Sequence, residues 1–452
     1  MRKLLTIILL ALFAGDSYVI GQVSSTDMPP AAMPTFWWRC GAGDSVLNFN
    51  NVISFGRRDS LVFDSLPYAK EYTMVVVYKA ADSMEATVWR MEYTDSAINS
   101  TRGLTTERII SDRTTIRYAG RTVTSPIINT LRQTAPDSAS PYVRLVTGND
   151  TLRGNVMVAE IMYFDKRLGT TMLRRVQSAL AIRYGVTLGP VDYVAGNGDP
   201  IWKYADGRRY HHRITGLGRD STYNLLQFRS CSEIDGAVLT IVADTLGEGS
   251  FLLVGDNDAP LYFEQDTPGV EILSRQWHVQ ATGMDGNGTS FVFDTRDLPL
   301  PTDSLVLLMD GYIVLPSSIT SNEVRFDNVL LPSDTCTLAL ARGSVLWQVA
   351  KNNAPDAKGG ARANNTEDSK YGTTPTTFNV FPNPTTGRYT VEVSGARQVQ
   401  VSIYNMYGVE VATFSDSERE HYVFSGNLPS GNSYYATVTT ESGSQTMKLV
   451  VK

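Results

Sequence analysis

Residues 155–185 read NVMVAEIMYFDKRLGTTMLRRVQSALAIRYG and hold both kinds of regular structure that the chain is expected to use. The segment 155–164 is an apolar run between turn residues, which is typical of a buried strand. In the segment 170–184 the apolar residues recur instead at helical spacing, on one face of an amphipathic helix. The members of that face are Leu173, Val176, Leu180 and Tyr184.

The ends of this helix are marked by residues that suit a cap. Thr170 or Thr171 can cap its start through a side-chain oxygen, and Gly185 follows it where a left-handed residue commonly ends a helix. The strand and the helix together are expected to close a first domain near Pro190.

Most of the remaining chain is predicted as short strands separated by turns, which favours β-sandwiches or barrels. The fold class is therefore mostly β with one short helix. The upstream strands are predicted at Tyr72–Tyr78, Thr87–Tyr93 and Tyr142–Thr147. The downstream strands are predicted at Ala237–Val242, Ser250–Val254, Trp277–Ala281, Ser290–Phe293, Leu305–Met309 and Cys336–Ala341.

The composition excludes several classes of protein. The chain has 452 residues, of which 42% are hydrophobic and 19% charged, too apolar for a disordered protein. At roughly 100–200 residues per domain, the length predicts two to four domains. The formal net charge of −6, from 40 basic and 46 acidic residues, lacks the basic excess typical of nucleic-acid binding.

Residues 1–21 are predicted to be a signal peptide. A positive start at residues 2–3 precedes the apolar run Leu4–Ala14, which suits a signal peptide and is too short to span a bilayer. Cleavage between Gly21 and Gln22 would leave small residues at the −3 and −1 positions. We therefore expect an exported protein, and no later segment is apolar and long enough to span a bilayer.

The three cysteines, Cys40, Cys231 and Cys336, are widely spaced and form no CxxC pair, which weakens a zinc or thioredoxin-like prediction. Cys40 lies far from the apolar run, in the wrong context for lipid attachment. Two alternatives stay open for these residues: one disulfide with one thiol left over, or three buried thiols that act as small hydrophobic side chains.

Residues 350–376 are rich in Asn, Gly, Ala and Thr and are predicted to be a flexible linker. The segment 377–452 follows as a small β unit of its own. Its strands are predicted at Phe378–Phe381, Tyr389–Val393, Gln400–Asn405, Val409–Phe414, Tyr422–Ser425, Tyr434–Thr439 and Met447–Val451.

Motifs of this last unit resemble the type A C-terminal sorting domain of proteins exported by the type IX secretion system. The matching stretches are Phe381–Gly387 (FPNPTTG), Val401–Gly408 (VSIYNMYG), Leu428–Gly431 (LPSG) and Lys448–Lys452 (KLVVK). Asn405 departs from the family, which usually has Asp there. The motif residues singled out are Pro382, Asn383, Pro384, Gly387, Tyr404, Gly408, Leu428, Gly431, Lys448 and Lys452.

This resemblance implies a route and a set of partners. The signal peptide would take the chain across the inner membrane, and an immunoglobulin-like β-sandwich sorting domain would take it across the outer membrane. The resemblance further implies contact with the secretion machinery, removal of the domain by a sorting protease, and anchoring to surface lipopolysaccharide or release outside the cell.

The upstream domains carry weaker resemblances. Residues 34–190, within a first domain at 22–190, resemble the laminin-G/concanavalin-A-like jelly roll of bacterial surface proteins, most specifically at the end of the helix and in LAIRYGVTL at 180–188. A second β-rich domain is predicted at 191–349. Its residues 192–257 resemble a domain that often follows in such exported proteins, through stretches such as Tyr210-His211-His212 and Gly216-Leu217-Gly218-Arg219-Asp220.

No catalytic set can be assembled from the sequence. The segment Glu233–Val238 (EIDGAV) resembles the start of the carboxylate motif of jelly-roll glucanases. A retaining glycosidase needs a second carboxyl about 5–5.5 Å from the first, but Ala237 and Val238 occupy the candidate positions. A turn beside a strand is the simpler interpretation.

Other candidate ligands also have simpler interpretations. His211 and His212 would point to opposite faces of an extended chain, and His278 is predicted at the edge of a core. Gly216–Asp220 lacks the third glycine of a dinucleotide loop, which leaves a tight turn. No cofactor is predicted, although calcium is an alternative to plain Asx turns in two oxygen-rich runs. These runs are Asp256, Asn257, Asp258 and Asp285, Asn287, Thr289.

Several aromatic residues could provide a face for stacking sugars or binding protein, although most aromatics in a β-sandwich belong to its core. They are Trp37, Trp38, Trp89, Trp202, Tyr72 and Tyr78. The function expected is that of a non-catalytic cell-surface protein that binds a glycan or protein ligand. The alternatives are a secreted cargo that contacts the secretion machinery or an envelope sensor to regulate secretion and, third, a carbohydrate-active enzyme.

Overall fold

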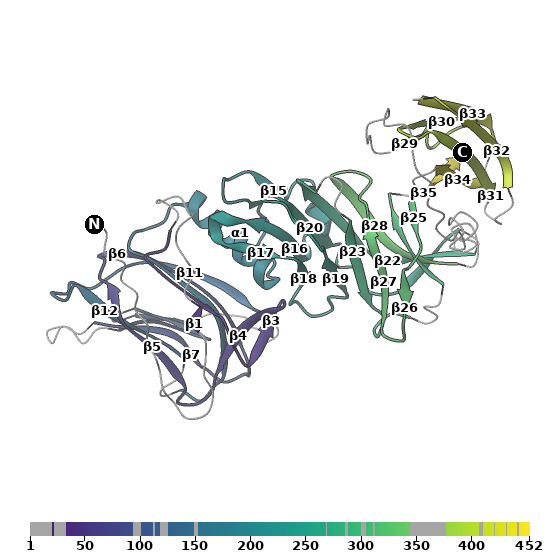
Figure 1. Ribbon diagram of the computed structural model, residues 1–452. Helices are drawn as coiled ribbons and strands as arrows, with labels where there is room; N and C mark the ends of the chain where they lie inside the picture. Colours follow the sequence, from purple (N-terminus) through teal and green to yellow (C-terminus); the bar gives the residue numbers. More distant parts are fainter. Residues whose placement is uncertain are drawn as a thin grey trace, which may run out of the picture. The chain divides into compact units, whose positions relative to one another are not determined.

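The computed structural model describes residues 20–21, 33–93, 101–111, 114–117, 125–148, 152–267, 269–284, 288–299, 304–310, 312–343, 377–405, 410–419, 421–430, 432–440 and 443–452. The chain forms two compact units, and Figure 1 labels their helix and many of their strands. Unit 1 holds the residues up to Lys203 together with Thr215–Ala237, and unit 2 holds Tyr204–Ile214 together with the residues from Val238 onward. The predicted linker and most of the predicted signal peptide, with Gln22, lie outside the described residues.

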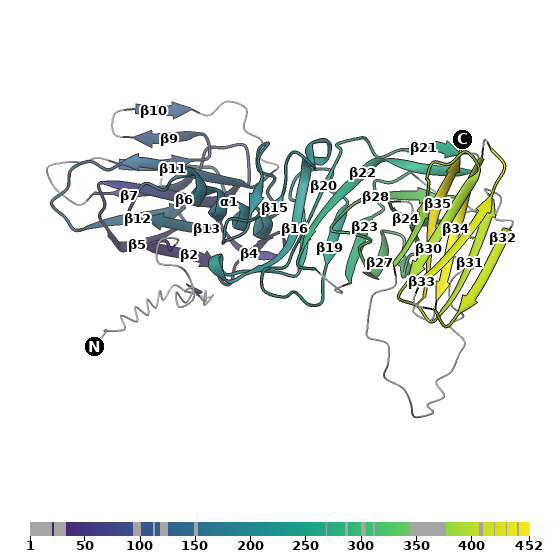
Figure 2. The same cartoon turned by 90° about the horizontal axis from the view of Figure 1, so that it is seen from above.

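Unit 1 is a β-sandwich of two antiparallel sheets, as predicted for the first domain (Figure 2). The first sheet has seven strands: β1 (Ile20–Gly21), β2 (Phe36–Cys40), β3 (Ser45–Leu47), β4 (Asn50–Phe55), β6 (Glu71–Ala80), β11 (Ile127–Thr134) and β13 (Val156–Phe164). The second has six, in the order β10 (Thr114–Arg117), β9 (Arg108–Ser111), β8 (Thr101–Thr105), β7 (Thr87–Glu92), β12 (Tyr142–Gly148) and β5 (Ser60–Pro67).

The central strands β6 and β13 carry mainly apolar side chains on both faces, with the exception of residues such as Glu160, because both faces are covered. One face, with Met74 and Val76, packs into the core between the two sheets. The opposite face, with Val75 and Val77, packs against α1 (Thr170–Tyr184). Side chains alternate along a strand, so a helix on the outer face explains the unbroken apolar run. All four residues of the predicted helix face are buried there.

The start of α1 differs from the prediction. The N-terminal cap is Gly169, and no side chain caps the helix, because Thr170 and Thr171 already lie in its first turn. The backbone carbonyl of Gly169 accepts a hydrogen bond from the Leu173 N–H at 3.0 Å. The end is as predicted, with Gly185 in the left-handed conformation at φ 61°.

Unit 1 also includes short elements that follow the helix. They are β14 (Tyr193–Val194), β15 (Pro200–Trp202), most of β16 (His212–Asp220), the 3₁₀ turn η2 (Ser221–Tyr223), β17 (Leu225–Gln227) and β18 (Arg229–Cys231). The tight turn predicted at Gly216–Asp220 is wrong, because this segment lies in β16 and pairs with β17. Asp220 ends the strand by capping η2, accepting a hydrogen bond from the Thr222 N–H at 2.9 Å.

In unit 2, Tyr204–Ile214 and the described part of residues 238–343 form what we call the second β domain. One sheet holds β20 (Phe251–Asp256), β22 (Val270–Thr282), β28 (Thr335–Arg342), β24 (Leu305–Met309) and β25 (Tyr312–Val314), with β21 (Phe263–Thr267) paired to β22. The other holds β19 (Leu239–Val242), β23 (Thr289–Asp294), β27 (Glu323–Val329) and β26 (Ser318–Ile319). Trp277 and Phe293 join the two sheets edge to face at 5.1 Å.

Unit 2 ends in a C-terminal domain of two sheets, and all seven predicted strands are confirmed there. One sheet has the order β29 (Thr377–Phe381), β30 (Arg388–Ser394), β33 (His421–Asn427). The other has the order β32 (Glu410–Ser417), β31 (Gln398–Asn405), β34 (Asn432–Thr440), β35 (Gly443–Val451). Side chains from both sheets fill one core, so the domain is a β-sandwich. The predicted boundary at residue 190 stays a prediction, since the compact packing of unit 1 runs on through Lys203.

Most of the singled-out aromatics are core residues. Trp38, Trp89, Trp202, Tyr72 and Tyr78 are buried, whereas Trp37 is half-buried and donates its indole N–H to Glu160 at 2.5 Å. The three cysteines are free thiols. Burial raises the pKa of Cys40 to about 11 and that of Cys336 to about 12, so both thiols stay protonated at neutral pH.

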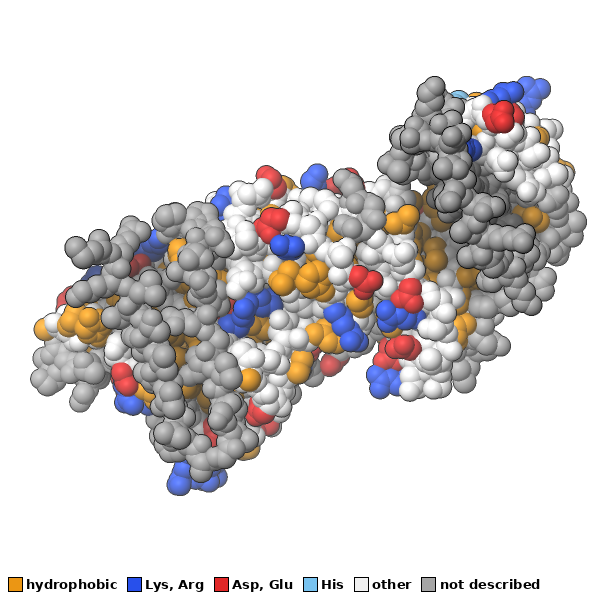
Figure 3. Space-filling model, in the orientation of Figure 1, with side chains coloured by type: hydrophobic (Ala, Val, Ile, Leu, Met, Phe, Trp, Pro, Cys, Tyr) orange, Lys and Arg blue, Asp and Glu red, His pale blue; other side chains and the backbone are white. Residues whose placement is uncertain are grey.

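The described surface mixes all kinds of side chain. On the face drawn in Figure 3, basic, acidic and apolar side chains are interspersed over the described residues. This pattern agrees with the balanced composition of the chain.

Candidate functional site

Part of the predicted motif of the C-terminal domain lies against its last strand. Asn383, between Pro382 and Pro384 in the bend after β29, bonds to the backbone of β35 through both atoms of its amide. Its Nδ2 donates to the Lys448 carbonyl at 2.6 Å, and its Oδ1 accepts from the Val450 N–H at 3.0 Å. The amide therefore completes hydrogen bonds that the edge of a sheet would otherwise leave to water.

The end of the chain is held by the next residue of the same bend. The Thr385 N–H donates to the Val450 carbonyl and the Lys452 N–H donates to the Thr385 carbonyl, each at 2.8 Å. The motif spacing thus serves one structural purpose, which is to tie the Pro-Asn-Pro bend to the C-terminal strand.

A second contact joins two other motif residues. The Leu428 N–H donates to the Gly387 carbonyl at 2.9 Å, and Leu428 is buried in the domain core. Gly387 has φ 131°, a conformation that favours glycine. Gly408 and Gly431 lie outside the described residues.

Two motif residues belong to a row of side chains in the C-terminal domain. The row crosses the outer face of the sheet formed by β32, β31, β34 and β35. Tyr404 of β31 is paired with Tyr435 of β34, and Tyr435 is paired with Lys448 of β35. Tyr434 and Ala436, the neighbours of Tyr435, face the domain's own core, so the row faces outward. Tyr435 was missed from the sequence, although the alternation that buries Tyr434 was a signal for it.

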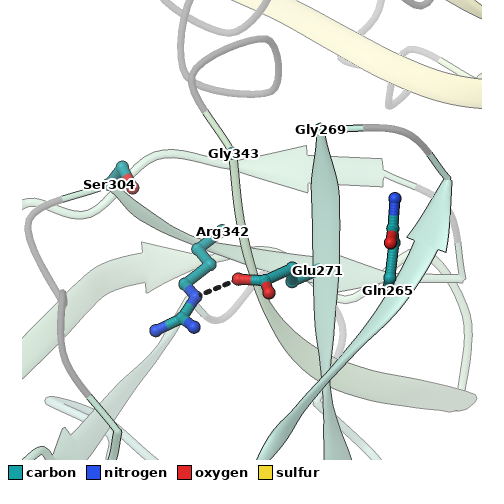
Figure 4. Close-up of a pocket in the computed structure, with 6 residues that line it drawn as sticks. All are labelled: Gln265, Gly269, Glu271, Ser304, Arg342 and Gly343. Atoms are coloured by element: carbon teal, nitrogen blue, oxygen red, sulfur yellow. Dashed lines mark hydrogen bonds and ion pairs between the residues drawn. The ribbon is translucent and has the colours of Figure 1, made fainter.

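A pocket lies at one end of the second β domain, where β28 ends. It is lined by Gln265, Gly269, Glu271, Ser304, Arg342 and Gly343 (Figure 4). Arg342 donates to Glu271 at 2.5 Å and to the Pro299 carbonyl at 3.0 Å. Its guanidinium also stacks over Phe263 at 4.2 Å. The charges of the pocket are therefore paired with each other.

In the first oxygen-rich run, at residues 256–258, an arginine lies where calcium was considered as an alternative. Arg213 donates to both oxygens of Asp256, at 2.7 and 2.8 Å, and to Asp258 at 2.5 Å. This bond lowers the pKa of Asp258. The guanidinium thus takes the place that a cation would need. The Asx turns expected here are present, since the Asp258 N–H donates to Asp256 at 2.8 Å. In the second run, Asp285 and Asn287 lie outside the described residues.

The glucanase-like segment is a turn, as the simpler interpretation predicts. The Ala237 N–H donates to the Ile234 carbonyl at 3.2 Å, and β19 begins after it. Glu233 accepts a hydrogen bond from the backbone N–H of Asn48 at 2.6 Å and lies 3.8 Å from the Lys79 ammonium. Its carboxylate therefore holds two parts of unit 1 together. Among the described residues, no group of three or more His, Cys, Asp or Glu side chains is set to hold a metal ion.

The histidines of the second β domain form aromatic pairs with tyrosines. Tyr204 meets His211 edge to face at 4.8 Å, and Tyr210 stacks on His278 at 5.6 Å. All four rings are half-buried, and we call them the aromatic patch. Arg208 and Arg209 of η1 (Arg208–Tyr210) are exposed beside it. His211 and His212 were predicted to point to opposite faces of the chain. The Nδ1 of His212 lies 3.8 Å from the Asp258 carboxylate.

Comparison with known families decides the nature of the C-terminal domain. The model of the secretion system C-terminal sorting domain matches residues 379–452. Residues 379–452 are a type IX sorting domain. The chain is therefore cargo of the type IX secretion system, exported to the cell surface or beyond it, and the sorting domain interacts with that machinery. Among the described residues, no helix is long and apolar enough to cross a membrane.

A second family model, a domain of unknown function (DUF8202), matches residues 172–333, from within α1 to the second β domain. Comparison with curated proteins finds no relative of the chain.

Three solved structures show weak similarity to the chain. The binding domain of botulinum neurotoxin DC in complex with SialylT is 10% identical, with a TM-score of 0.26 over 63% of this chain and 87% of that one. A Paenibacillus cycloisomaltooligosaccharide glucanotransferase is 10% identical, with a TM-score of 0.16 over 67% and 45%. The BSP domain of a biofilm-associated protein is 9% identical, with a TM-score of 0.14 over 91% and 84%. Similarities this weak identify neither a ligand nor a reaction, and the laminin-G-like subtype of the first domain stays a prediction.

Proposed function

We propose that the chain is a non-catalytic binding protein of the cell surface, and that the aromatic patch of the second β domain is where it binds. The support is the composition of this patch, in which half-buried tyrosine and histidine rings lie beside the exposed cations of Arg208 and Arg209. Tyrosine and arginine are the residues most enriched at binding sites, because they combine a large contact area with specific hydrogen bonds. A glycan or an acidic protein surface fits this chemistry.

The proposal that the chain is not an enzyme is supported by the state of its carboxylates. Glu233 is bonded to the backbone of Asn48, and Asp256 is bonded to Arg213 through both oxygens. Both carboxylates are thus engaged in contacts that hold parts of the fold together. Hydrolysis of a polysaccharide by the purified chain would overturn this part of the proposal.

The finer steps of delivery belong to the same proposal. A sorting protease would cut within the predicted linker, residues 350–376, and the released chain would be anchored to lipopolysaccharide. Deleting residues 377–452 is expected to leave the protein in the periplasm. Continued display of the shortened chain at the surface would contradict the sorting step, independently of any ligand.

The binding function is tested with the full chain on glycan arrays and on immobilised matrix proteins. Replacing Arg208 and Arg209 together with Ala should weaken binding at least about tenfold if these cations contact the ligand. Arg296→Ala is the matched control, since this arginine of the same domain is 70% exposed and is not one of the patch residues. Equal binding by both variants, or no ligand in either screen, would contradict the proposal. A deletion that changes secretion-gene expression and leaves adhesion intact would favour a regulatory cargo instead.

A further inference from the structure

One strand of the second β domain, β24, is apolar on both faces. In β24, the five residues Leu305–Met309 are all apolar, whereas a strand with one face in water would alternate with polar residues. Because side chains alternate, Val306 and Leu308 point away from Leu305 and Leu307. Trp277 and Phe293 join the sheet to its partner, so the sheet has a second face that must be covered by something else.

The sorting domain covers that second face. Val270, Val306 and Ala341 of the second β domain form one buried cluster with Tyr435 of the sorting domain, and Val306 and Ala341 are 0% exposed. Further apolar residues pack around this cluster, and we call the whole the latch face. They are Ile272, Leu308, Ile313, Leu315 and Tyr404.

Tyr435 is the centre of this contact. It is 3% exposed, although it projects from the outer face of its own domain. Burial raises the pKa of its hydroxyl to about 12, with a further contribution from the negative charge of Asp266. In the sorting domain alone this side chain would stand in water.

Polar contacts surround the apolar cluster. The Lys448 ammonium lies 2.7 Å from Asp266 of β21, with 27% and 35% of the two side chains exposed. The Tyr312 hydroxyl donates to the Phe378 carbonyl at 3.3 Å, and the two rings meet edge to face at 5.4 Å. An apolar centre with a polar rim is the usual anatomy of a protein interface.

We propose that the second β domain is a docking surface for its own sorting domain, and that this contact masks part of the sorting signal until the secretion machinery displaces it. The proposal rests on the assignment of residues 379–452 as a sorting domain. In this state Tyr404 packs against the buried cluster and Lys448 is paired with Asp266, so two residues of the sorting motif are engaged in the contact. The machinery can therefore reach the whole row Tyr404–Tyr435–Lys448 only after the domains separate.

The size of the contact suits a reversible latch. One buried tyrosine, a few aliphatic side chains and one half-exposed ion pair make a small interface. Because the two domains belong to one chain, docking needs only modest affinity, as covalent connection supplies an effective concentration on the order of millimolar. Such a contact can be stable within the chain and still yield to a partner that binds the signal more tightly.

The test uses the full chain with a specific protease site placed within residues 350–376. After cutting, the sorting domain of the unaltered chain should stay with the remainder on gel filtration at micromolar concentration. Tyr435→Ser should raise the dissociation constant at least about tenfold. Asp266→Lys, which sets two cations against each other, should also release the fragment.

Two further variants make this test specific. Asp297→Lys introduces the same charge reversal at an exposed turn of the same domain and should retain the fragment. Combining Asp266→Lys with Lys448→Asp restores an ion pair and should regain retention.

Immediate separation of the unaltered fragments would overturn the proposal, as would equal loss in the Asp297 control. Circular dichroism identifies a variant that fails to fold. In that case the double variant, Asp266→Lys with Lys448→Asp, decides the result. Retention is measured without a ligand or an export assay, so its failure is distinguishable from failure of the binding function or of the sorting assignment.

Discussion

Two ion pairs join segments that are far apart in the sequence, one within unit 1 and one within unit 2, and they differ in how far water reaches them. The Glu160–Arg183 pair of unit 1 is 2.9 Å long, and its side chains are 1% and 2% exposed. The Lys448–Asp266 pair of unit 2 is 2.7 Å long, but 27% and 35% exposed. The two pairs have similar N–O distances, and distance alone would predict similar effects on stability. Their burial differs, and burial predicts that breaking the Glu160–Arg183 pair has the larger effect.

The surroundings of the two pairs explain the difference. Glu160 also accepts hydrogen bonds from Trp37 at 2.5 Å and from Tyr184 at 2.9 Å. Arg183 donates from Nη2 to the carbonyls of Tyr223 and Asn224. Each buried charge is thus satisfied several times over, and the network is a permanent part of the fold. The pair in unit 2 has no comparable shell, which suits a contact that opens.

Breaking the buried pair is expected to have the largest effect. Glu160→Gln leaves the Arg183 charge buried without a counter-charge, and we expect a loss of about 3–5 kcal/mol in the free energy of unfolding. Urea unfolding followed by tryptophan fluorescence measures this loss. Glu92→Gln is the control, since Glu92 pairs with Arg144 at 3.0 Å on the surface of the same unit. It should cost less than about 1 kcal/mol, and similar losses in both variants would remove the distinction.

The second prediction concerns an uncharged side chain in the same unit. Asn48 is 2% exposed, and its amide donates to the carbonyls of Ile182 and Arg183 and accepts from the Cys231 N–H. Asn48→Ala leaves these groups unpaired, and we expect a loss of about 2–3 kcal/mol. The midpoint of thermal unfolding should fall, and the Cys231 amide should exchange its hydrogen faster.

Asn51→Ala is the matched control for Asn48, because the Asn51 amide makes one exposed bond, to the Gly41 carbonyl at 2.8 Å. It should change stability little. If Asn48→Ala proves as mild as this control, the amide does not hold the segments together in solution.

The third prediction tests the exposed pair in the same way. Asp266→Asn removes the charge and keeps the size, and the free energy of unfolding should change by about 0–1 kcal/mol, less at high salt. A loss as large as that of Glu160→Gln would show that the contact is a fixed part of unit 2, and would argue against a latch that opens. Chemical denaturation at low and at high salt measures both quantities.

Local patterns in the sequence predicted the helix and the strands better than they predicted which side chains contact each other. The seven strands of the sorting domain and the bounds of α1 follow from the spacing of apolar residues and from the turn residues between elements. Both signals extend over only a few residues. Gly216–Asp220 was misinterpreted as a turn, because glycine is typical of turns but also occurs inside strands, as it does in β16. The Thr170 cap failed because Gly169 supplies the first carbonyl of the helix.

Partners remote in the sequence could not be predicted. Lys448 was singled out from a motif, but Asp266, its partner 182 positions away, lies in a segment without any signal of its own. Arg213, which bonds to Asp256 in the first oxygen-rich run, could not be predicted as its partner either. Asn48 was an ordinary residue between two short strands, and only the fold brings Arg183 and Cys231 to its amide.

The smallest expected effect is a pH dependence at the aromatic patch of unit 2. Burial lowers the pKa of His278, although the negative charges of Asp310 and Asp206 partly oppose this shift. The folded state therefore binds a proton less readily than the unfolded state, whose histidine titrates near pH 6.5. The stability that His278 contributes is complete above that value and is lost as the pH falls through the folded pKa. Unit 1, whose residues include no histidine, should respond less.

Thermal unfolding at pH values from about 7.5 to 5 measures this dependence. His278→Gln should flatten the decline for unit 2, because glutamine fills part of the same space and does not titrate. His421→Gln is the control, since His421 lies on an exposed strand of the sorting domain, where its ring bonds to Ser394 at 2.7 Å. An unchanged slope in His278→Gln would mean that the ring opens to water in solution. The stacking on Tyr210 would then be too weak to hold the aromatic patch in the form on which binding depends.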